Sequence, residues 1–193
     1  MDNIYYLLIL IGIIIYIFIY INHKNTVYIT APSGKRYLIY RDNLKLEKVE
    51  LLDNIVFNMF LLKNYLVNNI KYFPDFNEYI LQLNQYFNEN RTTIYETDPT
   101  SSNTSYSVNK GEEVSFCLKS KKNGNIHNIN LLMYVAIHEM AHFACPEIGH
   151  TDLFKKIFKF FIKQAIKLGI YNKIDFPNNP TEYCGMTLRS SIV

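Results

Sequence analysis

Two histidines and one glutamate lie close together within an otherwise apolar stretch, residues 129–145. Beyond Asn130, the strongly polar side chains of this stretch are His138, Glu139 and His142. In an α-helix, positions four residues apart share one face with Cβ atoms about 5–6 Å apart, so both imidazoles can bind one metal ion. Glu139 is rotated by about 100° from His138, which suits a base acting on a metal-bound water. The H-E-x-x-H spacing therefore predicts zinc-assisted hydrolysis with Glu139 as the base.

The rest of this stretch is apolar on nearly all sides, which predicts a buried helix. Buried polar groups need partners, and a metal ion would supply one for the two histidines. The alternative is that other groups of the protein core hydrogen-bond both imidazoles without a metal.

A catalytic zinc ion usually has three protein ligands and one open position, so a further ligand must come from outside this helix. We expect it to be His150. Pro146 ends the helix and Gly149 permits a tight reversal, after which a new helix can begin at residue 151 or 152. The alternatives for the third ligand are three carboxylates, Glu147, Asp152 and Glu182.

Three other side chains could take part in the expected site. Thiolate ligation by Cys145 or Cys184 is typical of structural zinc sites and fits an H-E-x-x-H helix poorly. The group that would stabilise an oxyanion is not evident from the motif, and Tyr183 is the candidate for it.

The segments that must position these residues show both strand and helix patterns, and we expect an α+β fold. Residues 27–30 and 36–40 are β-branched or aromatic and flank a Pro-Ser-Gly turn, which predicts a hairpin. Residues 49–72 carry apolar side chains at helical spacing, and a second helix is expected over residues 76–87.

The middle of the chain reads as short strands joined by polar turns. Residues 93–96 and 114–118 predict strands, residues 97–104 an exposed loop, and residues 119–125 a basic turn. After the metal motif, lysines alternate with apolar residues as in an amphipathic helix with a solvated charged side. These lysines are Lys155, Lys156, Lys159, Lys163 and Lys167.

The N-terminus is uninterruptedly apolar over residues 4–21. A bilayer core needs about 20 apolar residues in a helix, so this run predicts an uncleaved transmembrane helix. We therefore expect two parts, a membrane anchor over residues 1–24 and one compact domain over residues 25–193. Basic residues lie only on the C-terminal flank, which places that domain on the cytoplasmic side. They are Lys24, Lys35, Arg36 and Arg41.

The length and composition of the chain limit the number of domains and the kinds of partner. A chain of 193 residues allows one domain of ordinary size, and a net charge of +3 is too small to indicate a polyanionic partner. Cys117, Cys145 and Cys184 are odd in number and far apart, so we expect reduced thiols.

The motif resembles the zincin peptidases of the WLM and SprT-like groups. The residues that carry the resemblance are 138–142, with the H-E-x-x-H pattern, and 149–154, where a Gly-His pair is followed by an aromatic residue. More narrowly, residues 105–111, 116–118 and 183–185 resemble membrane-tethered metallopeptidases encoded by large DNA viruses. The gap between His142 and His150 is longer than in the WLM and metzincin patterns.

The resemblance implies a zincin-type metallopeptidase domain that hydrolyses peptide bonds, with Zn²⁺ bound by His138, His142 and His150 and with Glu139 as base. In a viral protein, the domain would lie on the cytoplasmic side or in the virion interior. The expected partner is a protein or peptide substrate.

Two alternatives remain, a non-catalytic interaction protein on the same scaffold and a DNA-associated protease. The solvated lysines at residues 155–167 do not favour binding to nucleic acid. The sequence leaves the oligomeric state open.

Overall fold

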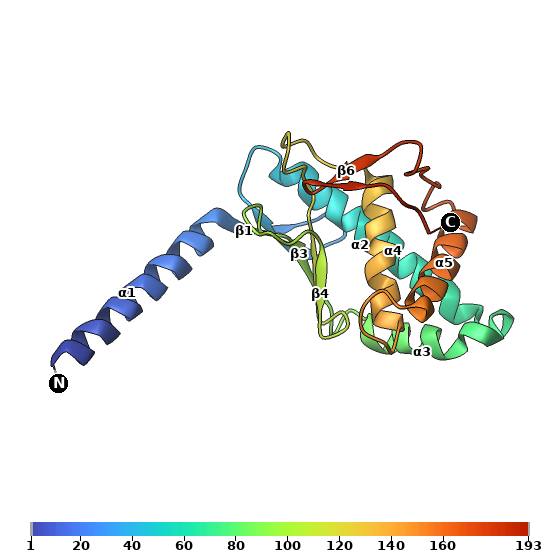
Figure 1. Cartoon of the computed structure of the whole chain (residues 1–193), viewed down its shortest axis with the longest axis horizontal. Coiled ribbons are helices and arrows are strands. Elements are labelled where there is room, and N and C mark those ends of the chain that lie inside the picture. The colour runs from blue at the N-terminus through green and yellow to red at the C-terminus, as the bar shows by residue number, and fades with distance from the viewer. Residues whose placement is uncertain (1, 193) are drawn as a thin grey trace.

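The computed structural model describes residues 2–192, and the side chains of residues 4–20 and 25–192. Helices and strands are mixed, which agrees with the expected α+β class (Figure 1). The elements in chain order are α1 (Asp2–Asn25), β1 (Thr26–Thr30), β2 (Arg36–Tyr40), α2 (Lys45–Asn68), the 3₁₀ turns η1 (Ile70–Tyr72) and η2 (Pro74–Phe76), α3 (Asn77–Tyr86), β3 (Thr93–Glu96), β4 (Tyr106–Val108), β5 (Glu113–Phe116), α4 (Ile129–Ala144), α5 (Asp152–Lys167), β6 (Thr181–Tyr183) and β7 (Met186–Leu188).

One mixed sheet and one small hairpin make up the β structure. The larger sheet has five strands in the order β1-β2-β3-β5-β4. The pairs β1–β2 and β4–β5 are antiparallel, while β2–β3 and β3–β5 are parallel. Strand β4 is therefore at an edge of this sheet. Strands β6 and β7 form a separate antiparallel hairpin.

The helices pack on one another around α4, which contacts α2, α3 and α5. In Figure 1, α4 lies between the sheet and α5. Helix α5 is amphipathic because its aromatic and aliphatic residues repeat at helical spacing, and it buries Phe154, Ile157, Phe158 and Phe161 among others. Its five lysines are exposed, as the sequence predicted. Burial of this apolar face is the main contribution to holding α5 in place.

The prediction of a transmembrane anchor is wrong. A helix does form over residues 2–25, and it runs away from the rest of the chain with its described apolar side chains exposed (Figure 1). However, among the described residues no helix has an apolar stretch of sufficient length to cross a bilayer. The prediction of a single-pass membrane protein with its domain on the cytoplasmic side depended on this anchor and is therefore also wrong. The side chains of Ile21 and Lys24, which the sequence analysis also used, lie outside the described residues.

The expectation of reduced cysteines is also wrong for two of the three. Cys117 and Cys184 form a disulfide with Cα atoms 6.0 Å apart, and Cys145 is a free, buried thiol. The two bonded residues are 67 positions apart, so only the fold brings them within the distance that a disulfide requires.

Candidate metal centre

Helix α4 carries the motif and is fixed at both ends by its own sequence. The side chain of Asn128 accepts a hydrogen bond from the backbone N–H of Asn130 at 2.8 Å, which caps the N-terminus. At the other end, Cys145 leaves the helical conformation and Pro146 follows, which cannot continue the helix. Most of the helix is buried, so His138 is held on a rigid support.

A short loop after α4 brings a third histidine back to the first two. Gly149 has φ = 84°, a left-handed conformation that glycine adopts without a steric penalty, and it turns the chain back as predicted. The next residues begin α5, where the Thr151 hydroxyl accepts a hydrogen bond from the Phe154 N–H at 3.3 Å. His150 is thus confined between a glycine turn and a capped helix.

The three imidazoles converge on one point. The Nε2 atoms of His138 and His142 are 3.1 Å apart, those of His142 and His150 are 3.2 Å apart, and those of His150 and His138 are 3.0 Å apart. Among the described residues this is the cluster with the geometry to hold a metal ion.

This triangle fits a bound cation better than hydrogen bonding. A ring nitrogen is either a donor or an acceptor, so three nitrogens in mutual contact must include at least one pair of the same kind. Three nitrogens bound to one tetrahedral zinc at about 2.0–2.1 Å would lie about 3.3 Å apart, close to the distances found. The donor set therefore suits Zn²⁺.

Aromatic packing orients the imidazoles, and burial keeps those of His138 and His142 neutral. The ring of Phe154 stacks on His142, with centroids 4.2 Å apart, and also contacts His138 and His150. Burial, reinforced by the neighbouring imidazoles, lowers the pKa of His138 to about 3 and that of His142 to about 4. Both rings are therefore uncharged at neutral pH, the state that binds a metal.

Glu139 lies beside this cluster and is almost fully buried, with 5% of its surface exposed. Burial raises its pKa to about 7, and a hydrogen bond with Ser107 acts in the opposite direction. A carboxyl group with a pKa near the working pH can both accept and return a proton. Its chemistry therefore matches the base predicted from the motif.

The cluster opens into a cavity of about 570 Å³. One side of the cavity is the edge strand β4 with the residues before it, and another is the β6–β7 hairpin. The lining surface is mostly apolar, and Tyr134, Val135, Met186 and Leu188 contribute to it. A concave, mostly apolar site with a few convergent polar groups is typical of ligand-binding pockets.

None of the three carboxylates considered as alternative third ligands belongs to the histidine cluster. Asp152 is exposed and forms an ion pair with Lys155 at 3.0 Å. Glu182 accepts a hydrogen bond from the Gly185 N–H. Glu147 is exposed and lines the cavity, but it is not part of the cluster of possible metal ligands.

Sequence comparison relates this chain to viral proteins. It is 44% identical over 161 residues to "Uncharacterized protein R325" of Acanthamoeba polyphaga mimivirus, an alignment that covers 83% of this chain and 81% of that protein. The chain belongs to the same family as that mimivirus protein. Two shorter similarities are to proteins of iridescent viruses, which agrees with the resemblance to proteins of large DNA viruses.

The first of these, "Uncharacterized protein 136R" of Invertebrate iridescent virus 6, is 41% identical over 71 residues, which cover 36% of this chain and 39% of that protein. The second, "Uncharacterized protein 042R" of Invertebrate iridescent virus 3, is 34% identical over 84 residues, which cover 42% of this chain and 50% of that protein. No protein-family model matches the chain.

Among solved structures, this chain is similar to a Wss1 mutant from Saccharomyces cerevisiae. The alignment has a TM-score of 0.36 and 15% identity, and it covers 53% of this chain and 87% of that chain.

Tyr183, the candidate oxyanion stabiliser, lines the cavity and is buried. Burial raises its pKa well above the usual range, so the phenol is protonated and its hydroxyl forms a hydrogen bond with Ser105. Ser105, Ser107 and Lys110 also line the cavity, and no role was predicted for them from the sequence. The available signal for this wall was the Asn109-Lys110-Gly111 triplet. It lies between two short segments of strand-forming residues and predicts a tight turn there.

Proposed function

We propose that this viral protein is a zinc-dependent metallopeptidase. The observation that carries the proposal is the convergence of three imidazole nitrogens beside a buried glutamate, inside a cavity. In this proposal His138, His142 and His150 hold Zn²⁺. When bound, zinc supplies a Lewis acid that polarises a carbonyl group and acidifies a water molecule.

Glu139 is the general base of the proposed reaction. Its carboxylate accepts a proton from the attacking water and returns it to the nitrogen of the departing amine. A group with a pKa of about 7 can perform both transfers near neutral pH. The burial that raises its pKa also keeps bulk water from competing for the proton.

An extended peptide is the substrate that suits this cavity. Strand β4 has β5 on one side and no strand on the other within the described part of the chain, and its residues Tyr106 and Ser107 line the cavity. A peptide in an extended conformation can hydrogen-bond to such an edge as an additional strand. The apolar lining near Tyr134 and Leu188 would accommodate an apolar side chain of that peptide.

The test uses the full chain, fluorescein-labelled casein as substrate, and metal analysis of the purified protein. We expect about one zinc per chain and hydrolysis that Glu139→Gln reduces at least about 100-fold without loss of zinc, because a base contributes about 10²–10⁴-fold. Glu147→Gln, which changes an exposed carboxylate at the same cavity, is the matched control and should retain activity. A protein that retains no zinc would refute the proposal, and a zinc-bound protein that cleaves nothing would indicate the non-catalytic scaffold instead.

A further inference from the structure

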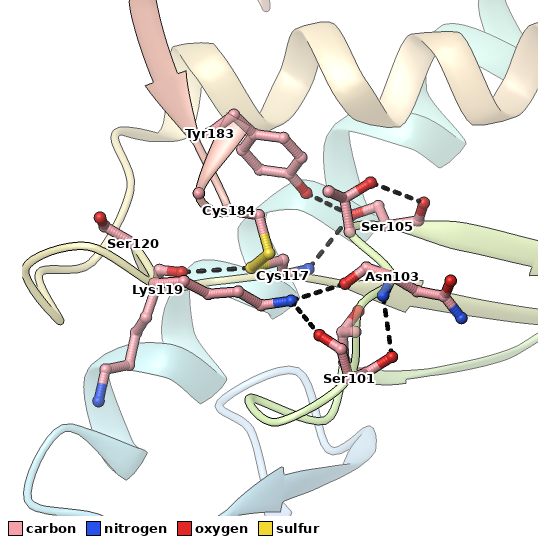
Figure 2. Close-up of a disulfide and its surroundings, with 12 residues drawn as sticks. Ser101, Asn103, Ser105, Cys117, Lys119, Ser120, Tyr183 and Cys184 are labelled. Atoms are coloured by element: carbon pink, nitrogen blue, oxygen red, sulfur yellow. Dashed lines mark hydrogen bonds between the residues drawn. A yellow bond between two sulfur atoms is a disulfide. The ribbon is translucent and has the colours of Figure 1, made fainter. Parts of the chain in front are cut away.

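The Cys117–Cys184 disulfide lies behind one wall of the metal cavity. Cys117 directly follows β5, and Cys184 is at the tip of the β6–β7 hairpin (Figure 2). Tyr183, the neighbour of Cys184, lines the cavity, as do Met186 and Leu188 on the other strand of the hairpin. The disulfide therefore attaches the wall formed by this hairpin to the main sheet.

Hydrogen bonds close a ring around this attachment. The Ser105 Oγ accepts a hydrogen bond from the Cys117 N–H at 3.1 Å and is also hydrogen-bonded to the Tyr183 hydroxyl. Tyr183 is joined to Cys184 by a peptide bond, and Cys184 to Cys117 by the disulfide. Figure 2 shows these four residues together, with the Tyr183 hydroxyl directed at Ser105.

A second contact fixes the same hairpin tip. The backbone N–H of Cys184 donates a hydrogen bond to the His127 Nε2 at 3.1 Å, and His127 is buried just before the N-cap of α4. Burial lowers the pKa of His127, so its Nε2 is an unprotonated acceptor at neutral pH. The tip is thus connected to β5, to the residues before β4, and to the start of the motif helix.

The hairpin is too small to hold its place without these contacts. Each of its strands has three residues, and Cys184 and Gly185 form the turn with φ of 50° and 90°. An isolated two-stranded hairpin is at best marginally stable in water, even with longer strands. The position of the hairpin relative to the cavity therefore depends on its contacts with the rest of the fold. Among these contacts, the disulfide is the covalent one.

We propose that the Cys117–Cys184 disulfide is a positioning element for substrate binding, which keeps the Tyr183–Leu188 wall against the metal cavity. The inference rests on the proposed function. The three histidines come from α4 and from the loop before α5, and none of them takes part in the ring. Breaking the disulfide should therefore weaken peptide binding and leave the metal in place.

The disulfide can be opened with a phosphine, which avoids the zinc chelation that dithiols cause. Tris(2-carboxyethyl)phosphine attacks one sulfur, the S–S bond breaks, and water supplies two protons to the thiolates and its oxygen to the phosphine oxide. The products are two thiols and one oxidised phosphine, so electrons and atoms balance. Cys145 is already a free thiol and is not changed by this reaction.

The experiment compares the zinc-loaded full chain before and after reduction. Binding of a leucine-containing tripeptide hydroxamate is titrated by calorimetry, casein hydrolysis gives KM and kcat, and metal analysis gives the zinc content. We expect Kd for the hydroxamate and KM to rise on the order of tenfold, or about 1.4 kcal/mol, with the zinc content nearly unchanged. Unchanged Kd and KM after complete reduction would overturn the inference, and so would loss of zinc, since the disulfide would then hold the whole site.

Variants separate positioning from general stability. Cys117→Ala with Cys184→Ala should reproduce the reduced protein and should no longer respond to the phosphine. If that protein does not fold at the assay temperature, Ser105→Ala keeps the disulfide and removes the hydroxyl that holds Tyr183, and it should raise KM on its own. Ser105→Thr, which retains a hydroxyl, should restore KM, whereas equal KM values for Ser105→Ala and the unmodified protein would refute the ring.

The two proposals fail in different ways. Absence of zinc in the oxidised protein refutes the metal centre itself. If zinc is bound and no casein is cleaved, the hydroxamate titration still reports on the wall, because it needs only the metal and the cavity. Cleavage that depends on Glu139 but not on the disulfide would leave the proposed function standing and remove this inference.

Discussion

The ammonium group of Lys110 lies 2.8 Å from the carbonyl oxygen of Cys145, the residue that directly follows α4. It also donates a hydrogen bond to the Pro146 carbonyl oxygen at 3.1 Å. The backbone of Lys110 is itself fixed, because Arg91 donates to its carbonyl oxygen at 3.1 Å. The turn between β4 and β5 thus holds the start of the loop that carries His150.

The first prediction concerns this contact. Lys110→Met should weaken zinc binding about tenfold, because the loop loses two hydrogen bonds from a charged donor and His150 is held less firmly. Contacts that orient metal ligands typically contribute about 10–100-fold to metal affinity. Competition with a chelating dye measures the change. Lys155→Met, which alters an exposed lysine on α5, is the control and should bind zinc normally. Equal affinities for both variants would show that Lys110 does not position the loop.

The second prediction tests the choice of third ligand. His150→Ala should lower zinc affinity at least about 100-fold, because it removes one of three first-sphere donors, a larger effect than the loss of an outer contact. Asp152→Ala removes the carboxylate that sequence reasoning also considered and should leave the affinity unchanged, since Asp152 pairs with Lys155. A large effect of Asp152→Ala with little effect of His150→Ala would reverse the assignment.

A third prediction concerns a buried ion pair that the sequence did not reveal. Lys48 is fully buried, and its ammonium group contacts both carboxylate oxygens of Glu96 at 2.9 and 2.8 Å and the Tyr40 carbonyl oxygen at 2.8 Å. Lys48→Met should cost about 3–5 kcal/mol of unfolding free energy, because it leaves the Glu96 carboxylate buried without its cation. Urea unfolding measures this cost.

The matched control is Lys35→Met, which breaks the ion pair between Lys35 and Glu89 at the surface. Exposed pairs of this kind contribute no more than about 1 kcal/mol. A loss for Lys48→Met as small as that for Lys35→Met would show that the buried pair does not stabilise the fold.

Sequence reasoning located the elements that have a strong pattern of their own. The hairpin at residues 26–40, helix α4 and helix α5 follow from β-branched runs, from apolar spacing and from the Pro146 and Gly149 signals. The convergence of His138, His142 and His150 follows from the same signals, since helical spacing pairs two of them and the glycine turn returns the third.

The cavity walls could not be predicted in the same way. Strands β4, β6 and β7 have three residues each, too few for an alternating pattern to be recognised. The Cys117–Cys184 pairing depends on a tertiary contact between segments 67 residues apart. The transmembrane prediction relied on apolar composition over residues 4–21, whereas among the described residues no helix is both long and apolar enough to cross a membrane.

The fourth prediction follows from the burial of Glu139. In the metal-free protein, burial raises the pKa of this carboxyl to about 7, above its ordinary value of 4.5. A raised pKa in the folded state contributes stability that is fully present below pH 4.5 and is lost as the pH rises toward 7. His138 and His142 act in the opposite direction, because their lowered pKa values favour the folded state as the pH rises toward 6.5.

Comparing two variants cancels the histidine contribution. Glu139→Gln keeps both histidines and has no charge to bury, so the metal-free variant should gain stability relative to the unmodified protein as the pH rises. Between pH 5 and pH 8 the difference should grow by on the order of 2–3 kcal/mol in urea unfolding, with metal removed by a chelator. Glu147→Gln, whose carboxylate is exposed, should show no such growth. If the difference in unfolding free energy between Glu139→Gln and the unmodified protein did not change with pH, Glu139 would be solvated in the metal-free state. It would then lack the raised pKa that a base in this site requires.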